Sequence, residues 1–275
     1  SGLVGSEMCI RDRSLILITS CEKVVDLDLS FNDETYVIDA KINKHVNSIS
    51  ATSEVLITKS RPYFEDNLKY INDASVKIVE LSTNKEYSLK FVSDGLYKFD
   101  IPKIDEQSEF RLIVEHQNNK FYSVERLTKS NLIDNVVQGE RDSFSGDDIE
   151  IITTFTDSSQ LDNYFLFEFG EKGNLQVARD LYINGNSFTF SYFINKNQIP
   201  NSKKLRVKME GINYYYFKYM LQILIQTNTQ NGPFSTPPAT IKGNIINQNN
   251  NSNDVFGYFK VCEYDEYILE DIIID

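Results

Sequence analysis

Residues 204–210, KLRVKME, decide the fold class of this chain, because polar and apolar side chains alternate in them without a break. Successive side chains of a β-strand point to opposite faces of its sheet, so this alternation predicts a strand with one buried face and one wet face. Similar runs occupy residues 36–42, 54–58, 76–81, 87–91, 110–115 and 164–169. Short strands separated by turn-forming residues at this spacing predict a mainly β protein made of antiparallel β-sandwiches.

Two sandwich domains fit the length of 275 residues, of which 41% are hydrophobic. We expect an N-terminal β-sandwich at residues 21–140 and a C-terminal β domain at residues 149–275. Residues 141–148, RDSFSGDD, are polar and contain glycine, which is typical of a linker between domains. Two further strands, at residues 255–263 and 267–274, are predicted to end the second domain.

The first domain resembles the prealbumin-like or carboxypeptidase-regulatory sandwich over residues 74–97. In this pattern Gly95 takes the positive φ of a hairpin turn and Tyr97 packs inward. The pattern describes a scaffold and carries no chemistry.

One segment of the second domain breaks the two-residue period. Residues 213–228 place apolar side chains at helical spacing, with Asn213 available as an N-terminal cap, and so predict a helix. The tyrosine and isoleucine content of the segment would also permit a strand. We expect its apolar stripe to be core rather than a ligand site, because aromatic side chains bury about 150–250 Å² each. The stripe consists of Phe217, Met220, Leu221 and Leu224.

Residues 17–21, LITSC, and the charged run that follows them indicate a bacterial lipoprotein signal. In such a signal an apolar stretch and small residues precede a cysteine that is lipidated and becomes the first residue of the mature protein. We therefore expect Cys21 to carry a membrane anchor; the alternative is an ordinary buried cysteine near the start of a strand. Only four apolar residues, 15–18, precede the small residues of the cleavage site, so we expect residues 1–20 to be a non-native leader followed by a truncated signal.

The composition excludes some classes of partner. A net charge of -12 argues against nucleic acid and against an anionic lipid surface, because binding to phosphate groups relies on clustered lysine and arginine. Because Cys9 falls in the leader and Cys21 is assigned to the lipid, Cys262 has no disulfide partner. We expect Cys262 to be a small buried hydrophobic residue rather than a reactive thiol.

Residues with catalytic or metal-binding chemistry form no recognisable motif in the sequence. The two histidines, His45 and His116, have no cysteine or glutamate at ligand spacing, so we predict surface histidines and no metal site. Nucleophile-elbow, phosphate-loop and dinucleotide glycine patterns are missing, so we predict no catalytic residue and no cofactor. Four acidic residues could bind calcium through oxygen atoms, although a solvated linker explains them better; they are Asp142, Asp147, Asp148 and Glu150.

Candidate contact residues for a ligand or partner lie in two turn-rich segments. The first contains Arg61, Tyr63 and Phe64, and the second, residues 232–238, contains Pro233 and Phe234. The alternative is purely structural, with a bulge in the first segment and a helix stop in the second.

Motifs along most of the chain resemble one family of bacterial proteins. They lie at residues 20–29 (SCEKVVDLDL), 36–40, 58–64, 216–224, 232–238, 243–245 and 257–259. Together they are similar to the Gram-negative surface lipoproteins grouped as domain of unknown function 4249. The resemblance covers residues 21–275 and implies a two-part, mostly β outer-membrane lipoprotein, of a kind often found alongside TonB-dependent nutrient-uptake receptors. It implies no catalytic residue, because the family has no established activity.

The expected function is therefore not enzymatic: a lipid-anchored outer-membrane accessory or binding protein that associates with a TonB-dependent receptor. An alternative is a surface adhesion or glycan-binding module of the envelope, which aromatic side chains exposed in a shallow groove would favour. A third hypothesis is a hydrolase with dispersed acidic residues, which would need a deep pocket holding a close carboxylate pair.

Overall fold

The computed structural model describes residues 34–61, 67–141, 146–157, 163–170, 173–180, 185–228, 240–249 and 255–274. Residues Asp33–Asp275 form one compact unit. The described part is mainly β, with one α-helix, α1 (Tyr214–Asn228), and a short 3-10 helix at Lys196–Gln198. Neither helix is long and apolar enough to cross a membrane.

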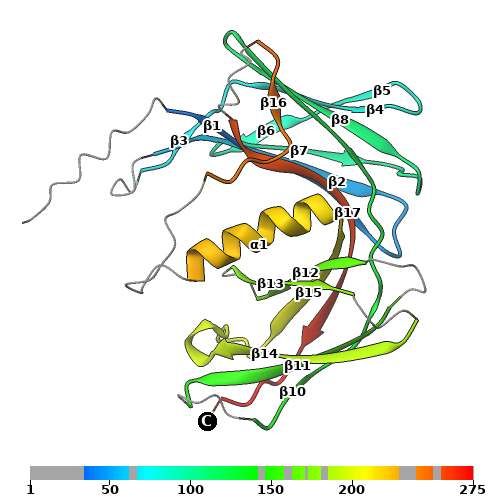
Figure 1. The fold of residues 1–275 in the computed structure, drawn as a ribbon, viewed down its shortest axis with the longest axis vertical. Coiled ribbons are helices and arrows are strands. Elements are labelled where there is room, and N and C mark those ends of the chain that lie inside the picture. Colours follow the sequence, from blue (N-terminus) through cyan, green and yellow to red (C-terminus); the bar gives the residue numbers. More distant parts are fainter. Residues whose placement is uncertain are drawn as a thin grey trace, which may run out of the picture. The chain divides into compact units, whose positions relative to one another are not determined.

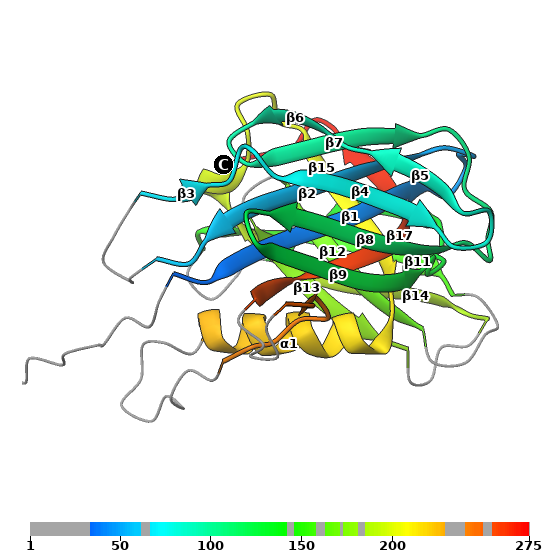
Figure 2. The ribbon, with the colours of Figure 1, turned by 90° about the horizontal axis from the view of Figure 1, so that it is seen from above.

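A nine-stranded sheet runs through both halves of the chain (Figure 1, Figure 2). Its strands lie in the order β13-β12-β15-β17-β1-β2-β7-β6, and the short β3 pairs with β2. In that order they are β13 (Asn174–Arg179), β12 (Tyr164–Phe169), β15 (Leu205–Ile212), β17 (Val255–Leu269), β1 (Tyr36–His45), β2 (Ala51–Lys59), β7 (Leu96–Ile101) and β6 (Lys90–Ser93), with β3 at Lys69–Tyr70.

Two smaller antiparallel sheets pack against this large sheet and make two sandwiches with it (Figure 1). The five-stranded sheet consists of β16 (Ile246–Asn247), β9 (Asn119–Arg126), β8 (Glu109–His116), β4 (Ser75–Glu80) and β5 (Lys85–Ser88). The three-stranded sheet consists of β10 (Ile133–Gln138), β11 (Asp148–Thr156) and β14 (Ser187–Asn195). The predicted fold class, mainly β sandwiches with one helix in the second half of the chain, is confirmed.

Each sandwich has its own hydrophobic core. The first core lies between the five-stranded sheet and the large sheet, and includes the fully buried rings of Phe110 and Phe121. The second core lies between the three-stranded sheet and the large sheet, and includes Phe167 and Met209. Burying side chains of this size contributes about 1.5–3 kcal/mol each, so the two cores supply most of the driving force for folding.

Strand β17 belongs to both sandwiches. Residues 255–264 pair in parallel with β1, and residues 264–269 pair antiparallel with β15. Val255 at its start is part of the first core, whereas Leu269 at its end packs against the second. One continuous strand therefore replaces the two C-terminal strands that the sequence predicts, and its pairing with β1 is parallel where antiparallel pairing was expected.

The division into domains at 21–140 and 149–275 stays a prediction. Strands from both ranges lie side by side in the large sheet, because β1 pairs with β17. The predicted linker, residues 141–148, falls between β10 and β11, and these two strands pair with each other. Along this part of the chain, Leu127 still packs in the first core, and Ile133 is the next buried hydrophobic residue and packs in the second.

Most local sequence predictions for the first half of the chain are confirmed. Strands β1, β2, β4 and β8 lie where alternation predicts them, although residues 87–91 are divided between β5 and β6. Asp94 and Gly95 make the turn between β6 and β7 with φ values of 46° and 70°. Tyr97 packs inward with 2% of its surface exposed, and its hydroxyl donates to the Ile71 carbonyl oxygen at 3.0 Å.

Strand β15 corrects the interpretation of the alternating stretch at 204–210. Every residue of Leu205–Ile212 is buried except the half-buried Arg206, so the predicted wet face is not wet. The prediction is wrong because β15 is a central strand, and α1 and aromatic side chains cover its second face. Alternation reports which residues share a face, but not what covers that face.

Helix α1 begins where the sequence predicts, because the Asn213 side-chain oxygen accepts the Tyr216 backbone N–H at 2.8 Å and so caps the helix. The buried side of α1 carries Tyr216 and Met220, with Ile223 packed beside them. Leu221, which was predicted to be core, is 37% exposed. The buried stripe is therefore rotated relative to the predicted one.

Gly257→Ala will destabilise the protein more than a substitution that strains only the backbone. A Cβ atom at Gly257, whose φ is +101°, would lie 1.9 Å from the Ile38 carbonyl oxygen of β1. We expect the free energy of unfolding, measured by urea denaturation, to fall by about 3 kcal/mol. The control is Gly173→Ala, where φ is +72° and no described atom lies within 4 Å of the new Cβ, so the loss should be about 1 kcal/mol. Equal losses would contradict a tight contact between β17 and β1.

Candidate functional site

The second sandwich has a cavity that opens to solvent between its edge strands, β13 and β14. We call it the aromatic cleft, and its volume is about 290 Å³. Its lining combines four phenylalanine rings with two small aliphatic side chains and three polar residues. These are Phe155, Phe165, Phe188 and Phe190, then Val177 and Ala178, then Gln176, Arg179 and Asp180.

Strand alternation positions the rings of the aromatic cleft. Phe188, Phe190 and Tyr192 are every second residue of β14, so they share the face that packs toward the large sheet. The Phe190 ring meets Phe167 edge to face at 4.8 Å, and Tyr192 stacks on Phe169 at 4.1 Å. These inner rings are fixed by their neighbours, whereas Phe188 stays 37% exposed at the mouth.

Two polar residues lie at the end of β13. The exposed Arg179 guanidinium lies 5.7 Å from the ring centre of Tyr164, whose ring packs beside α1 on the face of the large sheet opposite the cleft. The Asp180 side chain is buried, with 4% exposure, and its backbone N–H donates to the Asn163 carbonyl oxygen at 2.9 Å. A concave apolar surface with a few polar groups at its mouth is the usual form of a small-molecule site.

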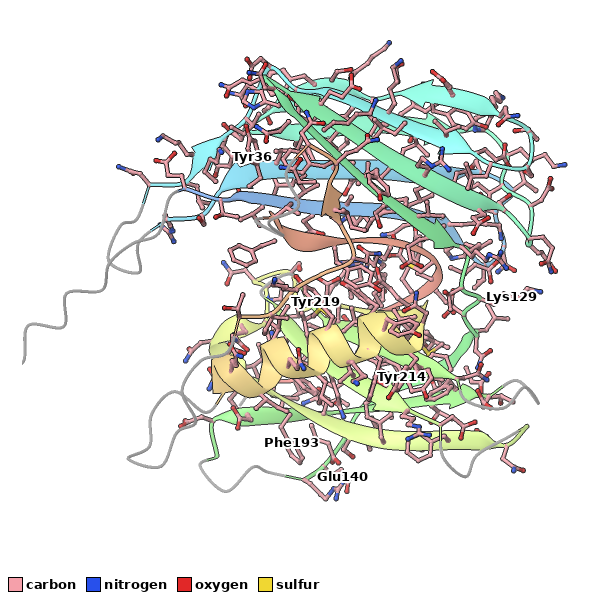
Figure 3. All side chains as sticks on the ribbon, turned by 45° about the horizontal axis from the view of Figure 1, so that its top comes forward. Tyr36, Lys129, Glu140, Phe193, Tyr214 and Tyr219 are labelled. Atoms are coloured by element: carbon pink, nitrogen blue, oxygen red, sulfur yellow. The ribbon has the colours of Figure 1, made fainter. Side chains whose placement is uncertain are left out.

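The opposite face of β14 points away from the large sheet and does not contribute to the cleft. Phe193, 39% exposed, lies on this outer face (Figure 3). Thr189 lies on the same face, where its hydroxyl hydrogen-bonds to that of Thr154 at 2.8 Å. The two faces of β14 can therefore be changed independently.

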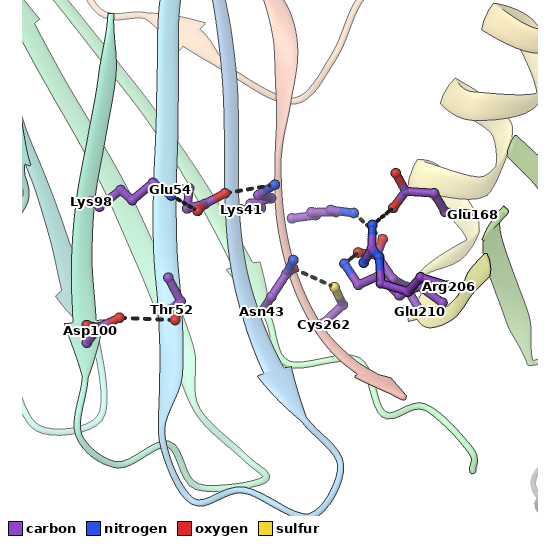
Figure 4. Close-up of polar contacts among 12 residues, drawn as sticks. Lys41, Asn43, Thr52, Glu54, Lys98, Asp100, Glu168, Arg206, Glu210 and Cys262 are labelled. Carbon is purple, nitrogen blue, oxygen red and sulfur yellow. Dashed lines mark hydrogen bonds and ion pairs between the residues drawn. The ribbon is translucent and has the colours of Figure 1, made fainter. Parts of the chain in front are cut away.

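Charged side chains cross the face of the large sheet that α1 partly covers (Figure 4). Glu54 of β2 pairs with Lys98 at 2.5 Å and with Lys41 at 2.9 Å. Burial by itself would raise the pKa of Glu54, but hydrogen bonds from the two lysines outweigh it and lower the pKa. Arg206 lies 3.6 Å from Glu168 further along the same face. Partly exposed pairs of this kind contribute at most about 1 kcal/mol each.

The centre of this charged face is a buried triad. Glu210 lies between Lys208, at 2.5 Å on the same strand, and Lys260 of β17, and the exposed fractions of the three side chains are 6%, 10% and 12%. Burial alone would raise the pKa of Glu210, but the two lysines outweigh it and hold the pKa at about 2. Burial alone would lower the pKa of Lys260, but the Glu210 carboxylate raises it well above its ordinary value. Glu210 and Lys260 therefore stay charged at neutral pH.

A half-buried carboxylate, Glu125 of β9, holds the start of α1 in place. It accepts hydrogen bonds from the side-chain amides of Asn213 at 2.9 Å and Asn244 at 2.7 Å, and from the Tyr258 hydroxyl at 3.3 Å. Burial raises the pKa of Glu125 although these donors oppose the shift. Beside this group, Tyr219 of α1 lies 5.1 Å from the Tyr258 ring, on the side that faces the large sheet (Figure 3). Because these groups bind one another, we interpret them as structural.

The histidines differ from the sequence prediction. His116 is 7% exposed; its Nδ1 lies 2.7 Å from the Tyr36 hydroxyl and its Nε2 lies 3.0 Å from Asp73. The prediction of a surface histidine is wrong here because the last side chain of β8 faces the first core. His45 is 33% exposed and lies 3.3 Å from Asp265. Among the described residues, no three His, Cys, Asp or Glu side chains gather as a metal site.

The acidic segment near 141–148 is only partly solvated. Glu150 of β11 is 1% exposed and accepts hydrogen bonds from the Arg141 side chain and from the Ser191 hydroxyl. These bonds, above all those from Arg141, lower the pKa of Glu150 to about 2. Asp148 begins β11 and accepts a hydrogen bond from Asn195 at 3.2 Å. The prediction of a solvated linker is therefore wrong for Glu150, because the contact with Arg141 shields its carboxylate from solvent.

Most of the site residues predicted from sequence fall outside the described part. Arg61 is described and is exposed just after the end of β2, away from the lining of the aromatic cleft. The other predicted residues, Cys21, Tyr63, Phe64, Pro233 and Phe234, lie outside the described residues. The cleft was not predicted, although residues 187–193, SFTFSYF, carry an aromatic side chain at every second position and would have indicated it.

The buried thiol agrees with the sequence prediction. Cys262 is 1% exposed, and burial raises the pKa of its thiol to about 12. Its Sγ lies 3.2 Å from the Asn43 side-chain oxygen, to which it donates (Figure 4). A neutral, covered thiol is a small hydrophobic residue and a poor nucleophile, because the thiolate is the reactive form.

The fold and the cleft define a mainly β, double-sandwich protein with an open apolar cavity. The sequence matches the family described as Domain of unknown function (DUF4249) over residues 22–268, and the chain belongs to this family. No curated protein matches it.

Similar solved structures have low sequence identity, and the likeness concerns the fold alone. One is described as "Structural insight into host cell surface retention of a 1.5-MDa bacterial ice-binding adhesin": it is 9% identical, with 86% of this chain and 63% of that chain covered and a TM-score of 0.24. This chain thus spans less than two thirds of that adhesin structure. A two-domain fibronectin type-III segment of chicken tenascin is 9% identical, with 66% and 93% covered and a TM-score of 0.21. The chicken CNTN1 FN1-FN3 domains are 12% identical, with 65% and 60% covered and a TM-score of 0.18.

Glu210→Gln will remove the charge that Lys208 and Lys260 share while keeping the shape of the side chain. We expect the free energy of unfolding at pH 7, measured by urea denaturation, to fall by about 3–5 kcal/mol, as for other broken buried ion pairs. The matched control is Glu270→Gln, which breaks an exposed pair with Lys204 whose side chains are 57% and 54% exposed. That control should lose less than about 1 kcal/mol.

The pH dependence of the free energy of unfolding, compared between the wild type and Glu210→Gln, gives a second measurement. Because the pKa of folded Glu210 is lowered from 4.5 to about 2, its contribution to stability is complete above pH 4.5 and is lost as the pH falls toward 2. The wild type should therefore lose more stability than Glu210→Gln across this interval. Parallel pH curves for the two proteins would contradict an ionised Glu210 in the folded state.

Proposed function

We propose that this chain is a lipid-anchored accessory of a TonB-dependent receptor in the outer membrane, and that it captures the nutrient that the receptor imports. Cys21 would carry the lipid, and the aromatic cleft would hold the ligand. The role is binding rather than catalysis.

The single observation that carries this proposal is the aromatic cleft. Ligand sites are typically concave and mainly apolar, with a few polar groups that orient the ligand and volumes of about 300–1,000 Å³. The cleft, at about 290 Å³, lies at the lower end of that range and is lined by four phenylalanine rings. A small flat molecule, or one ring of a larger one, would fit it, with polar atoms directed at Gln176.

The anchoring part of the proposal is supported by the sequence before β1. Cys21 precedes Tyr36, the first residue of β1, by 15 residues. A chain of that length spans at most about 50 Å when fully extended. A lipid on Cys21 would therefore keep the sandwiches close to the membrane surface, within reach of an integral receptor.

A pull-down from mildly solubilised outer membranes tests the receptor association. The protein is expressed with an intact native signal and a C-terminal tag, and a TonB-dependent receptor should copurify at about one copy per chain. Cys21→Ala should lose the receptor because the variant is no longer held at the membrane, whereas Cys262→Ala, which removes a buried thiol, should retain it. An anchored protein that purifies alone would contradict the accessory role.

A glycan-binding envelope module is the second candidate function, and the mouth of the aromatic cleft favours it. Phe188 is 37% exposed and Gln176 lines the same cleft, and an aromatic face with a polar group nearby suits a sugar ring.

An oligosaccharide array tests this second function with a variant that fills the cleft. Ala178→Phe places a ring in the cavity and should lower binding at least tenfold, because the ligand and the new side chain compete for the same volume. Thr189→Ala changes the outer face of the same region and should bind like the wild type. Equal binding by wild type and Ala178→Phe would exclude the cleft as the site.

A further inference from the structure

The aromatic cleft lies beside a sheet edge along which no described residue pairs. Strand β14 pairs with β11 on one side only, and we call its other side the free edge. Phe188 and Phe190 of β14 line the cleft, so the free edge borders the same cavity. Backbone hydrogen-bonding groups are therefore available to a ligand there, in addition to the aromatic rings.

The hydrogen bonds at the two ends of β14 show which backbone groups point to the free edge. The Asp157 N–H donates to the Asn186 carbonyl oxygen at 3.0 Å, and the Lys196 N–H donates to the Asp147 carbonyl oxygen at 2.9 Å. Residues of an antiparallel pair alternate between those that bond across the ladder and those that do not. Because the register is unbroken, the even-numbered residues of β14 bond to β11. The N–H and C=O groups of residues 187, 189, 191 and 193 therefore point to the free edge.

Strand β14 differs from the other described edge strands in length and charge. Natural sheets protect their edges with short strands, charged residues, proline or bulges. The described edge strands β3, β5, β6, β10, β13 and β16 are two to six residues long, and all but β16 carry a charged residue. In contrast, β14 has nine residues, SFTFSYFIN, with no charge, no proline and no register shift. A long neutral edge of this kind is complementary to another strand.

We propose that the ligand of the aromatic cleft is a peptide in extended conformation, which adds to β14 as an antiparallel strand. This inference rests on the function proposed above and names the class of nutrient. The peptide backbone bonds to the N–H and C=O groups of Thr189 and Ser191, and these bonds do not depend on the peptide sequence. Every second side chain of the peptide lies on the same face as Phe188 and Phe190 and packs into the cleft. The site therefore selects apolar residues at alternate positions.

A peptide uses both parts of this site. A small apolar molecule could fill the cleft, but it would leave the backbone groups of the free edge without partners. An added strand pairs with those groups and also fills the cavity, which is the usual way in which a sheet edge binds a peptide. The net charge of -12 favours peptides with basic residues, because opposite charge attracts a ligand at long range. Since β14 is itself neutral, basic residues fit best at the ends of the bound segment.

Titration with one synthetic nonapeptide, KTVTFTVTK, tests the proposal. Its valine and phenylalanine side chains would face the cleft, and its threonine side chains would face outward. We expect isothermal titration calorimetry at pH 7 to give one peptide per chain. We also expect backbone hydrogen–deuterium exchange over residues 187–193 to slow when the peptide is bound, because the free edge becomes paired.

Two N-methylated forms of this peptide are matched controls. In an antiparallel added strand the threonine N–H groups point toward β14, whereas the valine N–H groups point away from it. N-methylation of the two threonines beside phenylalanine should weaken binding by about tenfold or more, because two hydrogen bonds are lost. N-methylation of the two valines should change the dissociation constant by less than about threefold.

A pair of protein variants tests the same contact from the other side. Thr189→Pro removes an N–H group of the free edge and should weaken peptide binding about tenfold or more. Its pairing with β11 should survive, because proline is tolerated on an edge strand where the N–H faces solvent. Thr189→Ala keeps the N–H group and should bind like the wild type. If Thr189→Pro fails to fold, the N-methylated peptides decide the question with the wild-type protein.

Three outcomes would overturn the proposal. They are a wild-type protein that does not bind KTVTFTVTK, equal binding of the two N-methylated peptides, and a dimer in sedimentation that Thr189→Pro converts to a monomer. The dimer would mean that a second copy of the chain occupies the free edge. The receptor pull-down described above tests the proposed function separately. A receptor that copurifies while no peptide binds would reject only the peptide, and peptide binding without a receptor would reject only the accessory role.

Discussion

The pairing of β17 with both β1 and β15 is the constraint on which the rest of this structure depends. Because β17 supplies side chains to both cores, its register sets where each small sheet can pack. The part of the β17 edge that β15 does not cover is also hydrogen-bonded. The Thr128 backbone N–H donates to the Val261 carbonyl oxygen at 3.0 Å, and its carbonyl oxygen accepts the Glu263 N–H at 2.8 Å. The Asn244 side-chain amide donates to the Phe259 carbonyl oxygen and accepts the Phe259 N–H, both at 2.8 Å. A strand held on both edges cannot shift without breaking contacts in both sandwiches.

The buried charges on the same sheet act with this pairing. Removing three charged side chains from water is costly, and a buried ion pair is rarely a large net source of stability. Its stronger effect is on register. A slip of β17 by one residue would turn Lys260 to the opposite face of the sheet and leave Glu210 with one lysine instead of two. The Glu210 triad thus makes shifted pairings of β17 with β15 less stable than the observed register.

The sequence predicts the local elements of this fold better than their surroundings. The turn at Asp94 and Gly95 and the cap at Asn213 depend on a few neighbouring residues, and the structure confirms both. The predictions of a solvent-exposed face on β15 and of a surface position for His116 were wrong, because burial depends on strands far away in the sequence. The aromatic cleft depends on two edge strands from different sheets, so no single stretch of sequence defines it. Residues such as Tyr63 and Pro233, which were proposed for a contact surface, lie outside the described residues.

The parallel partnership between the first and last long strands also bears on the order of folding. Tyr36 pairs with Val255, so the sheet closes across 219 residues of chain. Contacts between distant segments are slow to form, because the entropy of closing such a loop is lost before the contacts are gained. During synthesis, β1 has no partner on that edge until residues 255–264 have been made. The central sheet therefore cannot be completed in a nascent chain that lacks these residues.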